Sequence, residues 1–406
     1  MTRVAIVGGG ASGFAAAITV ARAGKAFQVT IYERLPKPLK KILATGNGRC
    51  NLGNVELSLT DYFGDTDFAE NALTRFSPQS NIEFFESLGL LTKTEEMGRV
   101  YPLSGQAASV REVLLSEAAR LGVRIVTDCE ITEIQPRNGG FLLNGQYACD
   151  KLILCAGGSA APKHGTDGSA FRLLEALHIP IKTPAPALTA LTCAHFPKSL
   201  KGVRQTCFVR LFCENSEVYT IQGEVQFTDY GLSGIPIMQL SRLVSANPKA
   251  RFTIQLDCLP QISETDLCRF LETEAKRDST KSVGALLLGI LPQALGNALL
   301  LRRRIPKDTP CAAVSARDFG ALAKEIKGCV FSVSGVRGFD FAQVTAGGAD
   351  CAAFSAQSMR AKQYPNLYVC GETLNVDGGC GGYNLQWAWS SGRAAGEAVI
   401  KEQSAC

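Results

Sequence analysis

The first 33 residues constrain the fold of this chain most. The apolar run at residues 4–7 is typical of a buried parallel strand, and it leads into a G-x-G-x-x-G motif formed by Gly8, Gly10 and Gly13. In such a motif the first glycine permits a tight turn, the second lets the backbone approach a pyrophosphate, and the third lets helix and strand pack closely. A helix that begins near Ala11 would direct its free N–H groups and its positive dipole end at the phosphates.

The residues after this motif complete a dinucleotide-binding unit. Ala17 and Gly24 are expected to keep the helix close to the sheet, residues 28–32 predict the next strand, and Glu33 ends it. An acid about twenty residues beyond the glycines accepts hydrogen bonds from the ribose hydroxyls of an adenosine. Because an acid there disfavours a 2′-phosphate, the site suits FAD or NAD rather than NADP. The agreement of strand, glycines and acid favours a ligand site over a glycine turn without a ligand.

Composition indicates an ordinary globular protein. The 406 residues suffice for two or three domains, and 46% hydrophobic with 19% charged residues is usual for a folded chain. The net charge of +5 is small, and the basic residues are scattered except at 37–41 and 302–304. We therefore expect no nucleic-acid partner.

Cysteine and histidine usage indicates no metal site. The 15 cysteines contain no C-x-x-C pair, which fits neither a zinc site nor a disulfide framework. The histidines, His164, His178 and His195, have no metal-site or triad spacing. Since no signal peptide precedes the first strand, we expect a cytoplasmic protein with reduced thiols, many of them small buried hydrophobes.

One apolar stretch, residues 283–301, is flanked by Lys281 and by the arginines at 302–304. Pro292, Gln293 and Asn297 interrupt it, and polar or helix-breaking groups are costly in lipid. We expect two buried helices that meet at Pro292, and no membrane partner.

Alternating strands and helices predict an α/β class with a parallel sheet covered by helices on both faces. Helices are expected at 80–88 and 110–121, and strands at 123–127, 130–134, 141–143 and 151–155. From about Pro184 the pattern changes, and short strands are expected at 206–213, 217–221, 223–227 and 252–256. We therefore predict a discontinuous nucleotide-binding domain at 1–186 and 335–406, interrupted by a β-rich insert at 187–260 and a helical insert at 261–334.

The C-terminal region contains a second glycine-rich approach to a helix. A strand at 367–370 is followed by Gly378, Gly379, Gly381 and Gly382, and a helix is expected from about Tyr383 to residue 400. This glycine run removes side chains and exposes backbone N–H groups. The helix N-terminus could stabilise negative charge on a reduced flavin near N1 and C2=O, while the N-terminal turn takes the adenine end.

Several longer motifs together resemble one family. They are Lys40-Lys41, TGNGRCN at 45–51, RVYP at 99–102, FTDYGLSG at 227–234, QVTAGG at 343–348, LYVCGE at 367–372 and GGYNLQWA at 381–388. Over nearly the whole chain they resemble the BaiN-like group of NAD(P)/FAD-dependent oxidoreductases. The namesake of this group reduces C=C bonds in 3-oxo bile-acid intermediates, and some members are described as aminoacetone oxidase-like.

The resemblance implies a Rossmann-like FAD domain of the two-dinucleotide-binding flavoprotein type, with a β-barrel-like insert and a helical insert. It also implies the residues that hold FAD: Gly8, Gly10, Ala11, Ser12, Gly13, Glu33, Lys40, Lys41, Thr45, Gly46, Gly48, Arg49, Cys50, Asn51, Ile131, Gly371, Glu372, Asp377, Gly381, Gly382, Tyr383 and Asn384. The chain departs from the family pattern at Asn47, where many members have a second glycine, and at Cys380, where a threonine is common.

The sequence specifies the reductant and the catalytic residues less closely than it specifies the flavin site. No second complete G-x-G-x-x-G follows a strand, so NADH or NADPH is expected to dock transiently over the flavin. Candidates for a proton or hydrogen-bond donor are Tyr101, Tyr230, Tyr383 and Cys50, and each residue type is also a common packing group. Arg49 could complement an anion or anchor its loop. No catalytic residue is assigned.

Three function classes follow from these observations. The first is reduction of an activated C=C bond in a small enone, of steroid or bile-acid type, by hydride transfer from NAD(P)H through flavin N5. The second is an FAD oxidase of a small amine, and the third is a non-catalytic or RNA-associated flavoprotein. The motifs specify neither the substrate nor the oligomeric state.

Overall fold

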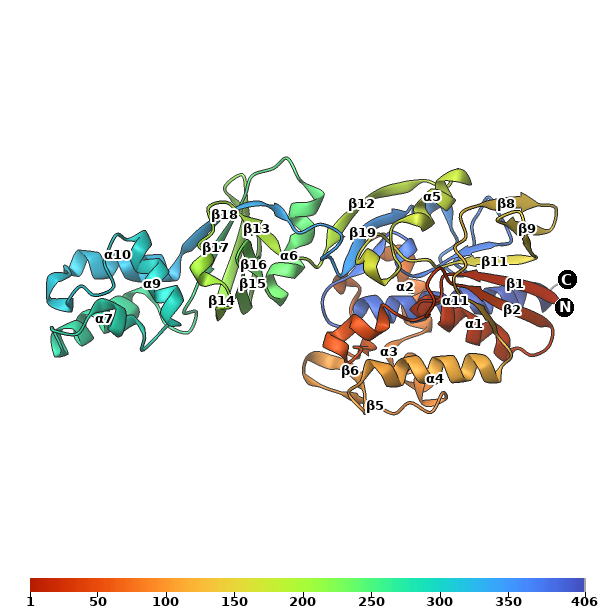
Figure 1. The fold of residues 1–406 in the computed structure, drawn as a ribbon, viewed down its shortest axis with the longest axis horizontal. Helices are drawn as coiled ribbons and strands as arrows, with labels where there is room; N and C mark the ends of the chain where they lie inside the picture. The colour runs from red at the N-terminus through yellow and green to blue at the C-terminus, as the bar shows by residue number, and fades with distance from the viewer. Residues whose placement is uncertain (405–406) are drawn as a thin grey trace. The chain divides into compact units, whose positions relative to one another are not determined.

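The computed structural model describes residues 1–404 and consists of two compact units (Figure 1). The nucleotide-binding unit comprises Met1–Pro186 and the segment from Ala342 onward, and the inserted unit is Ala187–Phe341. Each unit has its own hydrophobic core.

A five-stranded parallel sheet, in the order β20-β11-β1-β2-β7, forms the centre of the nucleotide-binding unit. The apolar runs at residues 4–7 of β1 and 152–154 of β11 are buried, as expected for a parallel sheet covered on both faces. Because the carboxyl ends of parallel strands meet at one edge, the segments that follow β1, β2, β11 and β20 gather there. The strands are β1 (Thr2–Val7), β2 (Phe27–Tyr32), β7 (Arg124–Val126), β11 (Lys151–Leu154) and β20 (Leu367–Val369).

Two helices from opposite ends of the chain, α1 (Ala11–Arg22) and α11 (Tyr383–Ser404), pack closely beside this sheet (Figure 1). A Cβ on Gly392 of α11 would lie 2.4 Å from the carbonyl oxygen of Ser12, so the two backbones nearly touch. The expectation that Gly24 packs against the sheet is wrong. A Cβ there would meet nothing within 4 Å, and its φ of +97° instead serves the turn that ends α1.

Smaller sheets and helices complete the nucleotide-binding unit. The strand predicted at 130–134 begins only at Ile134, because residues 128–131 run as irregular backbone beside Glu33 and Leu35. Two three-stranded sheets are formed by β3 (Gly53–Asn54), β6 (Arg99–Pro102) and β5 (Thr92–Thr94), and by β8 (Ile134–Arg137), β9 (Gly140–Leu143) and β10 (Tyr147–Cys149). Two strand pairs are formed by β4 (Tyr62–Gly64) with β21 (Val376–Gly378) and by β12 (Ile181–Ala187) with β19 (Val344–Ala349). The further helices are α2 (Thr66–Arg75), α3 (Pro78–Glu86), α4 (Ala107–Arg120) and α5 (Ser169–Ala176).

The inserted unit contains a closed barrel in the order β13-β16-β15-β14-β17-β18. The strands predicted at 217–221 and 223–227 are one continuous strand, which pairs with β14 along its length. Gly223 lies within this strand. A larger residue would not fit there, because a Cβ would come 2.7 Å from the Pro236 ring. The barrel elements are β13 (Leu191–Cys193), β14 (Arg204–Cys213), β15 (Ser216–Phe227), β16 (Gly231–Ser233), β17 (Phe252–Asp257), β18 (Cys329–Val336) and the adjoining helix α6 (Ile235–Ala246).

Four helices follow β17: α7 (Glu264–Arg277), α8 (Val283–Leu287), α9 (Gln293–Arg302) and α10 (Ala316–Lys327). Pro292 is the N-cap of α9, so the predicted break of the apolar stretch at this proline is confirmed. None of the helices among the described residues is long and apolar enough to cross a membrane. The predicted α/β class is confirmed: a Rossmann-type parallel sheet with a closed barrel and a helical insert.

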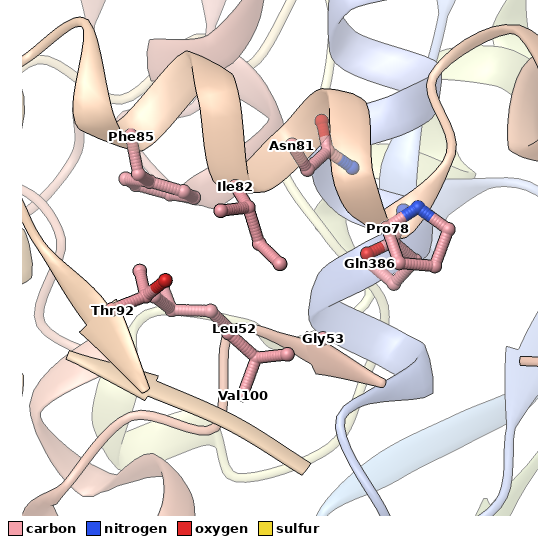
Figure 2. Close-up of a pocket in the computed structure, with 9 residues that line it drawn as sticks. All are labelled: Leu52, Gly53, Pro78, Asn81, Ile82, Phe85, Thr92, Val100 and Gln386. Atoms are coloured by element: carbon pink, nitrogen blue, oxygen red, sulfur yellow. The ribbon is translucent and has the colours of Figure 1, made fainter. Parts of the chain in front are cut away.

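A small pocket, partly open to solvent, lies between α3 and the β3-β6-β5 sheet. Figure 2 shows Ile82 and Phe85 of α3 facing Leu52 and Thr92 across it. The amides on its wall are already engaged, because Asn81 and Gln386 donate hydrogen bonds to the carbonyl of Phe76. None of the residues predicted to hold FAD lines this pocket, so it is not the predicted cofactor site.

Candidate functional site

The glycine turn between β1 and α1 is tightly packed at two positions and open at a third. Gly8 has a φ of +110°, and a Cβ there would lie 2.5 Å from the carbonyl oxygen of Cys155. A Cβ on Gly13 would lie 2.0 Å from the Gly8 carbonyl oxygen. Gly10, in contrast, would meet nothing within 4 Å. The turn therefore leaves its free surface at Gly10, at the N-terminus of α1, where a pyrophosphate would bind.

Glu33 is 8% exposed and holds this turn. One carboxylate oxygen accepts a hydrogen bond from the Gly9 amide at 2.8 Å, and the other accepts from the Leu35 amide at 2.8 Å. Each oxygen keeps a further acceptor site, which is what a ribose hydroxyl would use. The predicted residue Ile131 is buried nearby, since the Glu33 carbonyl accepts from Cys129 and the Leu35 carbonyl accepts from Asp128.

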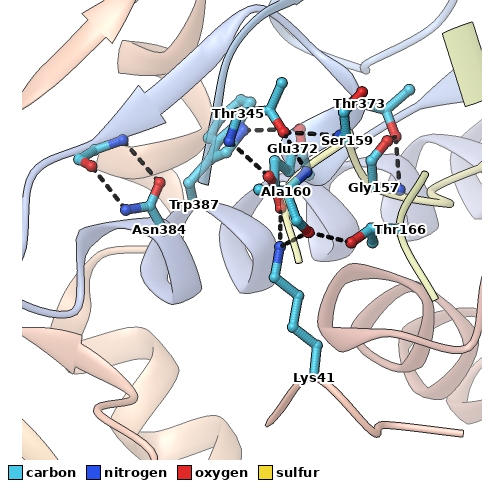
Figure 3. A network of polar contacts seen from close by, with 12 residues as sticks. Lys41, Gly157, Ser159, Ala160, Thr166, Thr345, Glu372, Thr373, Asn384 and Trp387 are labelled. Carbon is cyan, nitrogen blue, oxygen red and sulfur yellow. Dashed lines mark hydrogen bonds and ion pairs between the residues drawn. The ribbon is translucent and has the colours of Figure 1, made fainter. Parts of the chain in front are cut away.

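An ion pair between Lys41 and Glu372 joins the two ends of the nucleotide-binding unit (Figure 3). Lys41 Nζ lies 2.8 Å from Glu372 Oε2, and the other oxygen of Glu372 accepts from the Thr345 amide at 2.8 Å. The Thr345 hydroxyl in turn accepts from the amides of Ser159 and Ala160, at 2.8 and 3.0 Å. Loops after β2 and β11, strand β19 and the segment after β20 thus converge on one network.

Thr345 is a site residue that the sequence analysis missed. It lies within the QVTAGG motif, but nothing in that motif indicates that its hydroxyl organises the loop after β11. Lys40, by contrast, points away from the network, because its ammonium donates to the Lys163 carbonyl at 2.8 Å in an exposed position.

The loop of residues 45–51 follows an unusual backbone path. Gly46, Asn47, Gly48 and Cys50 all have positive φ, between +54° and +83°. The Thr45 hydroxyl donates to the Ile42 carbonyl at 2.7 Å, and the Thr45 carbonyl accepts from the Cys50 amide at 3.1 Å. Asn47 has a φ of +55°, and asparagine is among the residues that tolerate this left-handed conformation.

Asn51 brings this loop against the second glycine run. Its side-chain oxygen is buried and has no hydrogen-bond partner among the described residues. A Cβ on Gly382, whose φ is +103°, would come 2.7 Å from that oxygen and 2.4 Å from the Gly53 carbonyl oxygen. An unpartnered buried acceptor beside a cradle that only glycine can form fits a group with N–H donors, such as the isoalloxazine ring of FAD.

The entry to α11 is fixed by side-chain hydrogen bonds. Asn384 accepts from the Gly378 amide at 2.8 Å and donates to the Gly378 carbonyl at 2.7 Å (Figure 3). Asn54, 2% exposed, donates to the Gly381 carbonyl at 3.1 Å and to the Tyr383 hydroxyl at 3.4 Å. Gly371, with a φ of +71°, lies against Ser12 of α1, since a Cβ there would come 2.6 Å from the Ser12 hydroxyl.

The candidate donors differ in their surroundings. Cys50 is fully buried, and burial raises the pKa of its thiol to about 12, so it stays protonated at neutral pH. Burial also raises the pKa of the Tyr383 phenol. Arg49 lies over the Tyr101 ring, 4.0 Å from its centre, and forms an ion pair with Glu95 at 2.5 Å; both contacts are consistent with the loop-anchoring alternative.

Tyr230 lies in the inserted unit, where the Arg337 guanidinium is 4.3 Å from its ring centre. Asp377 is buried in β21. Among residues 1–404, no three histidine, cysteine or acidic side chains are grouped so that they could share a metal ion.

The family model described as the HI0933-like protein Rossmann domain matches residues 2–398. This chain belongs to the HI0933-like family. A curated relative from Clostridium scindens, the 3-dehydro-bile acid delta(4,6)-reductase, is 36% identical over 99% of this chain and 100% of its own length. The resemblance to the BaiN-like group is thereby confirmed.

Two further relatives are named for a reaction on RNA. The ribosomal RNA dihydrouridine synthases of Haemophilus influenzae and Escherichia coli are each 28% identical over 98% of this chain and 98% of their own lengths. Among solved structures, the 3-ketosteroid delta1-dehydrogenase of Sterolibacterium denitrificans matches with a TM-score of 0.52 and 12% identity over 99% of this chain and 100% of that one. At that identity the likeness shows the fold alone.

Proposed function

We propose that this HI0933-like protein is an FAD-dependent oxidoreductase that reduces a C=C bond conjugated to a carbonyl, with NADH or NADPH as the reductant. The observation that carries the proposal is the pairing of Asn51 and Gly382: an unpartnered buried acceptor lies beside a position, just before α11, that only glycine can occupy. When bound, FAD supplies hydride transfer at its N5 atom.

The residues would divide the cofactor between them. Glu33 would accept from the adenosine ribose, and the surface at Gly10, Ala11 and Ser12 would bind the pyrophosphate through backbone N–H groups. Asn51 and Gly382 would contact the isoalloxazine ring. The Lys41–Glu372 pair would hold the loops around these groups in place.

The chain itself would contribute electrostatics and a proton. The N-terminus of α11 would stabilise negative charge that develops at the ring. We take Tyr383 as the candidate proton donor, because it begins α11 and its partly buried phenol, whose pKa is raised by burial, keeps its proton at neutral pH. A positioned general acid typically contributes ~10²–10⁴-fold to the rate.

The substrate proposed first is a small enone of the steroid or bile-acid type. The relative whose name describes such a reductase aligns with 99% of this chain at 36% identity. The substrate-binding residues are not assigned by any motif.

A second candidate is reduction of a uracil base within RNA. Two relatives named as ribosomal RNA dihydrouridine synthases align with 98% of this chain. Converting uridine to dihydrouridine adds hydrogen across the C5=C6 bond, which is conjugated to the C4 carbonyl. Both candidates therefore require the same reaction class, and they differ in what surrounds the reacting bond.

Anaerobic stopped-flow mixing tests the proposal. The purified protein should absorb near about 450 nm and bleach on mixing with NADH or NADPH. A yellow protein that bleaches only with a small amine would favour an amine oxidase instead. A colourless protein that fails to bind added FAD would overturn the flavoenzyme assignment.

A further inference from the structure

The net positive charge of this protein is confined to the inserted unit. Residues 187–341 contain 19 lysines and arginines against 14 aspartates and glutamates. The rest of the chain contains 23 of each and is neutral. A sum over the whole sequence hides this difference, because a charge of +5 on 406 residues is unremarkable in itself.

Three exposed cations, Arg303, Arg304 and Lys307, follow the C-terminus of α9. Backbone hydrogen bonds place their loop beside the segment that starts α8: the Gly284 amide donates to the Lys307 carbonyl at 2.9 Å, and the Lys281 carbonyl accepts from the Cys311 amide at 2.9 Å. Lys281 therefore lies in the segment that these hydrogen bonds hold beside the loop. We call Lys281, Arg303, Arg304 and Lys307 the basic edge.

Most other cations of this unit already have acidic partners. Arg302 lies 2.6 Å from Glu325, Lys327 lies 2.7 Å from Asp257, and Arg277 lies 2.6 Å from Glu274. Within the described part of the chain, Arg303, Arg304 and Lys307 form no ion pair, so they are available to an external anion.

Two acids lie close to the basic edge in sequence. The Asp278 carboxylate is turned into its own loop, where it accepts from the amides of Thr280 and Lys281. Asp308 is exposed within the same loop as Lys307, and it leaves the edge with a positive excess. Cations after a helix C-terminus also stabilise the helix through its dipole, but this effect is confined to the last turn. It does not by itself account for three cations within five residues.

We propose that the basic edge binds the phosphate backbone of single-stranded RNA. The choice of RNA over other polyanions rests on the second candidate function, in which the reacting base is a uracil. Closely spaced, unpaired arginines and lysines bind phosphates with little sequence selectivity and release counterions, so the affinity falls as salt rises. The edge would therefore deliver affinity without base selectivity.

The test uses the full chain and a fluorescein-labelled oligouridylate, with binding followed by fluorescence anisotropy over a salt series. The first variant, R303E/R304E/K307E, reverses the three charges. The second, R303Q/R304Q/K307Q, only removes them and so adds no negative charge that would repel RNA. The matched control is K25E/R137E/K362E, which makes the same charge change at exposed positions of the nucleotide-binding unit.

We expect the wild type and the control to bind with similar affinity. Both loop variants should bind at least about tenfold more weakly, and the slope of log K against log salt should fall by about two, since each lost phosphate contact contributes ~0.7 on a single strand. Equal binding by the wild type and the loop variants, equal loss in the control, or no salt dependence would overturn the proposal.

A second readout separates this proposal from the proposed function. Each variant is assayed for flavin absorbance and for NADH-driven reduction of cyclohexenone, which carries no phosphate. Normal flavin and reductase activity with weakened RNA binding supports the basic edge. Absent flavin in the wild type would overturn the enzyme assignment while the binding comparison still decides the RNA surface.

Discussion

At the scale of single residues, Gly382 offers the sharpest test of the cofactor site. Gly382→Ala would bring a Cβ within 2.4 Å of the Gly53 carbonyl oxygen and 2.7 Å of the Asn51 side chain. We expect a folded protein with little or no bound flavin, measured as the ratio of absorbance near about 450 nm to that at about 280 nm.

Gly89→Ala is the matched control for that substitution. Gly89 has a φ of +83° but would meet nothing within 4 Å, so it carries the left-handed backbone cost, about 1 kcal/mol, without the clash. It should keep its flavin. Normal flavin content in Gly382→Ala would contradict the assignment of this cradle to the ring.

The Lys41–Glu372 pair is a second residue-scale test. Lys41→Met leaves the partly buried Glu372 carboxylate without its cation and should weaken flavin binding and lower thermal stability, by about 1–3 kcal/mol. Adding Glu372→Gln should restore part of both, as a double-mutant cycle followed by thermal unfolding would show. Strict additivity of the two changes would mean that the pair does not act as a unit.

Cys50 is predicted to be unreactive. Burial raises the pKa of its thiol to about 12, and the thiolate is the form that reacts with alkylating agents. Mass spectrometry after iodoacetamide treatment of the native protein should find Cys50 unmodified while the partly exposed Cys129 and Cys213 are labelled. Rapid labelling of Cys50 would argue for the catalytic thiol role instead.

At the scale of elements, the close contact between α1 and α11 limits which residues can replace the glycines of α11. Gly392→Ala raises helix propensity by about 1 kcal/mol, yet the added Cβ would lie 2.4 Å from the Ser12 carbonyl oxygen. We expect a net loss of about 1–3 kcal/mol in unfolding free energy, measured by denaturant titration. Gly320→Ala in α10, whose Cβ would have an ordinary contact at 3.8 Å, should instead be neutral or stabilising.

The turns and helix boundaries that could be predicted from the sequence are those set by residues within a few positions of one another. The turn at Gly8, the break at Pro292 and the helix that begins at Tyr383 follow from glycine, proline and apolar spacing within a few residues. The strands predicted at 217–221 and 223–227 form the single strand β15, and its continuity depends on pairing with β14, which is not visible in the local sequence.

The network around Glu372 could not be predicted in the same way. Lys41 and Glu372 are 331 residues apart, and Thr345 and Ser159 are 186 apart. Only the strand order of the folded sheet brings them together. The resemblance named Lys41 and Glu372 as cofactor residues, but their bond to each other is visible only in three dimensions.

At the scale of the whole molecule, the two units have separate hydrophobic cores, and all residues predicted to hold FAD belong to the nucleotide-binding unit. The neighbouring strands β12 and β19 carry the chain out of that unit and back. Replacing residues 187–341 with a short Gly-Ser linker should therefore leave a folded protein that binds flavin. RNA binding should be lost with the basic edge, and loss of flavin in this variant would show that the inserted unit is needed for the cofactor site.

The most direct measurement of the central claim is the oxidative half-reaction. The protein is first reduced anaerobically with NADH or NADPH and then mixed with cyclohexenone in a second anaerobic step, while absorbance near about 450 nm is followed. A reductase of conjugated C=C bonds should regain its yellow colour as saturated ketone forms in equal amount. A protein that stays bleached with the enone and with uridine-containing RNA, but is reoxidised by oxygen, would contradict the account.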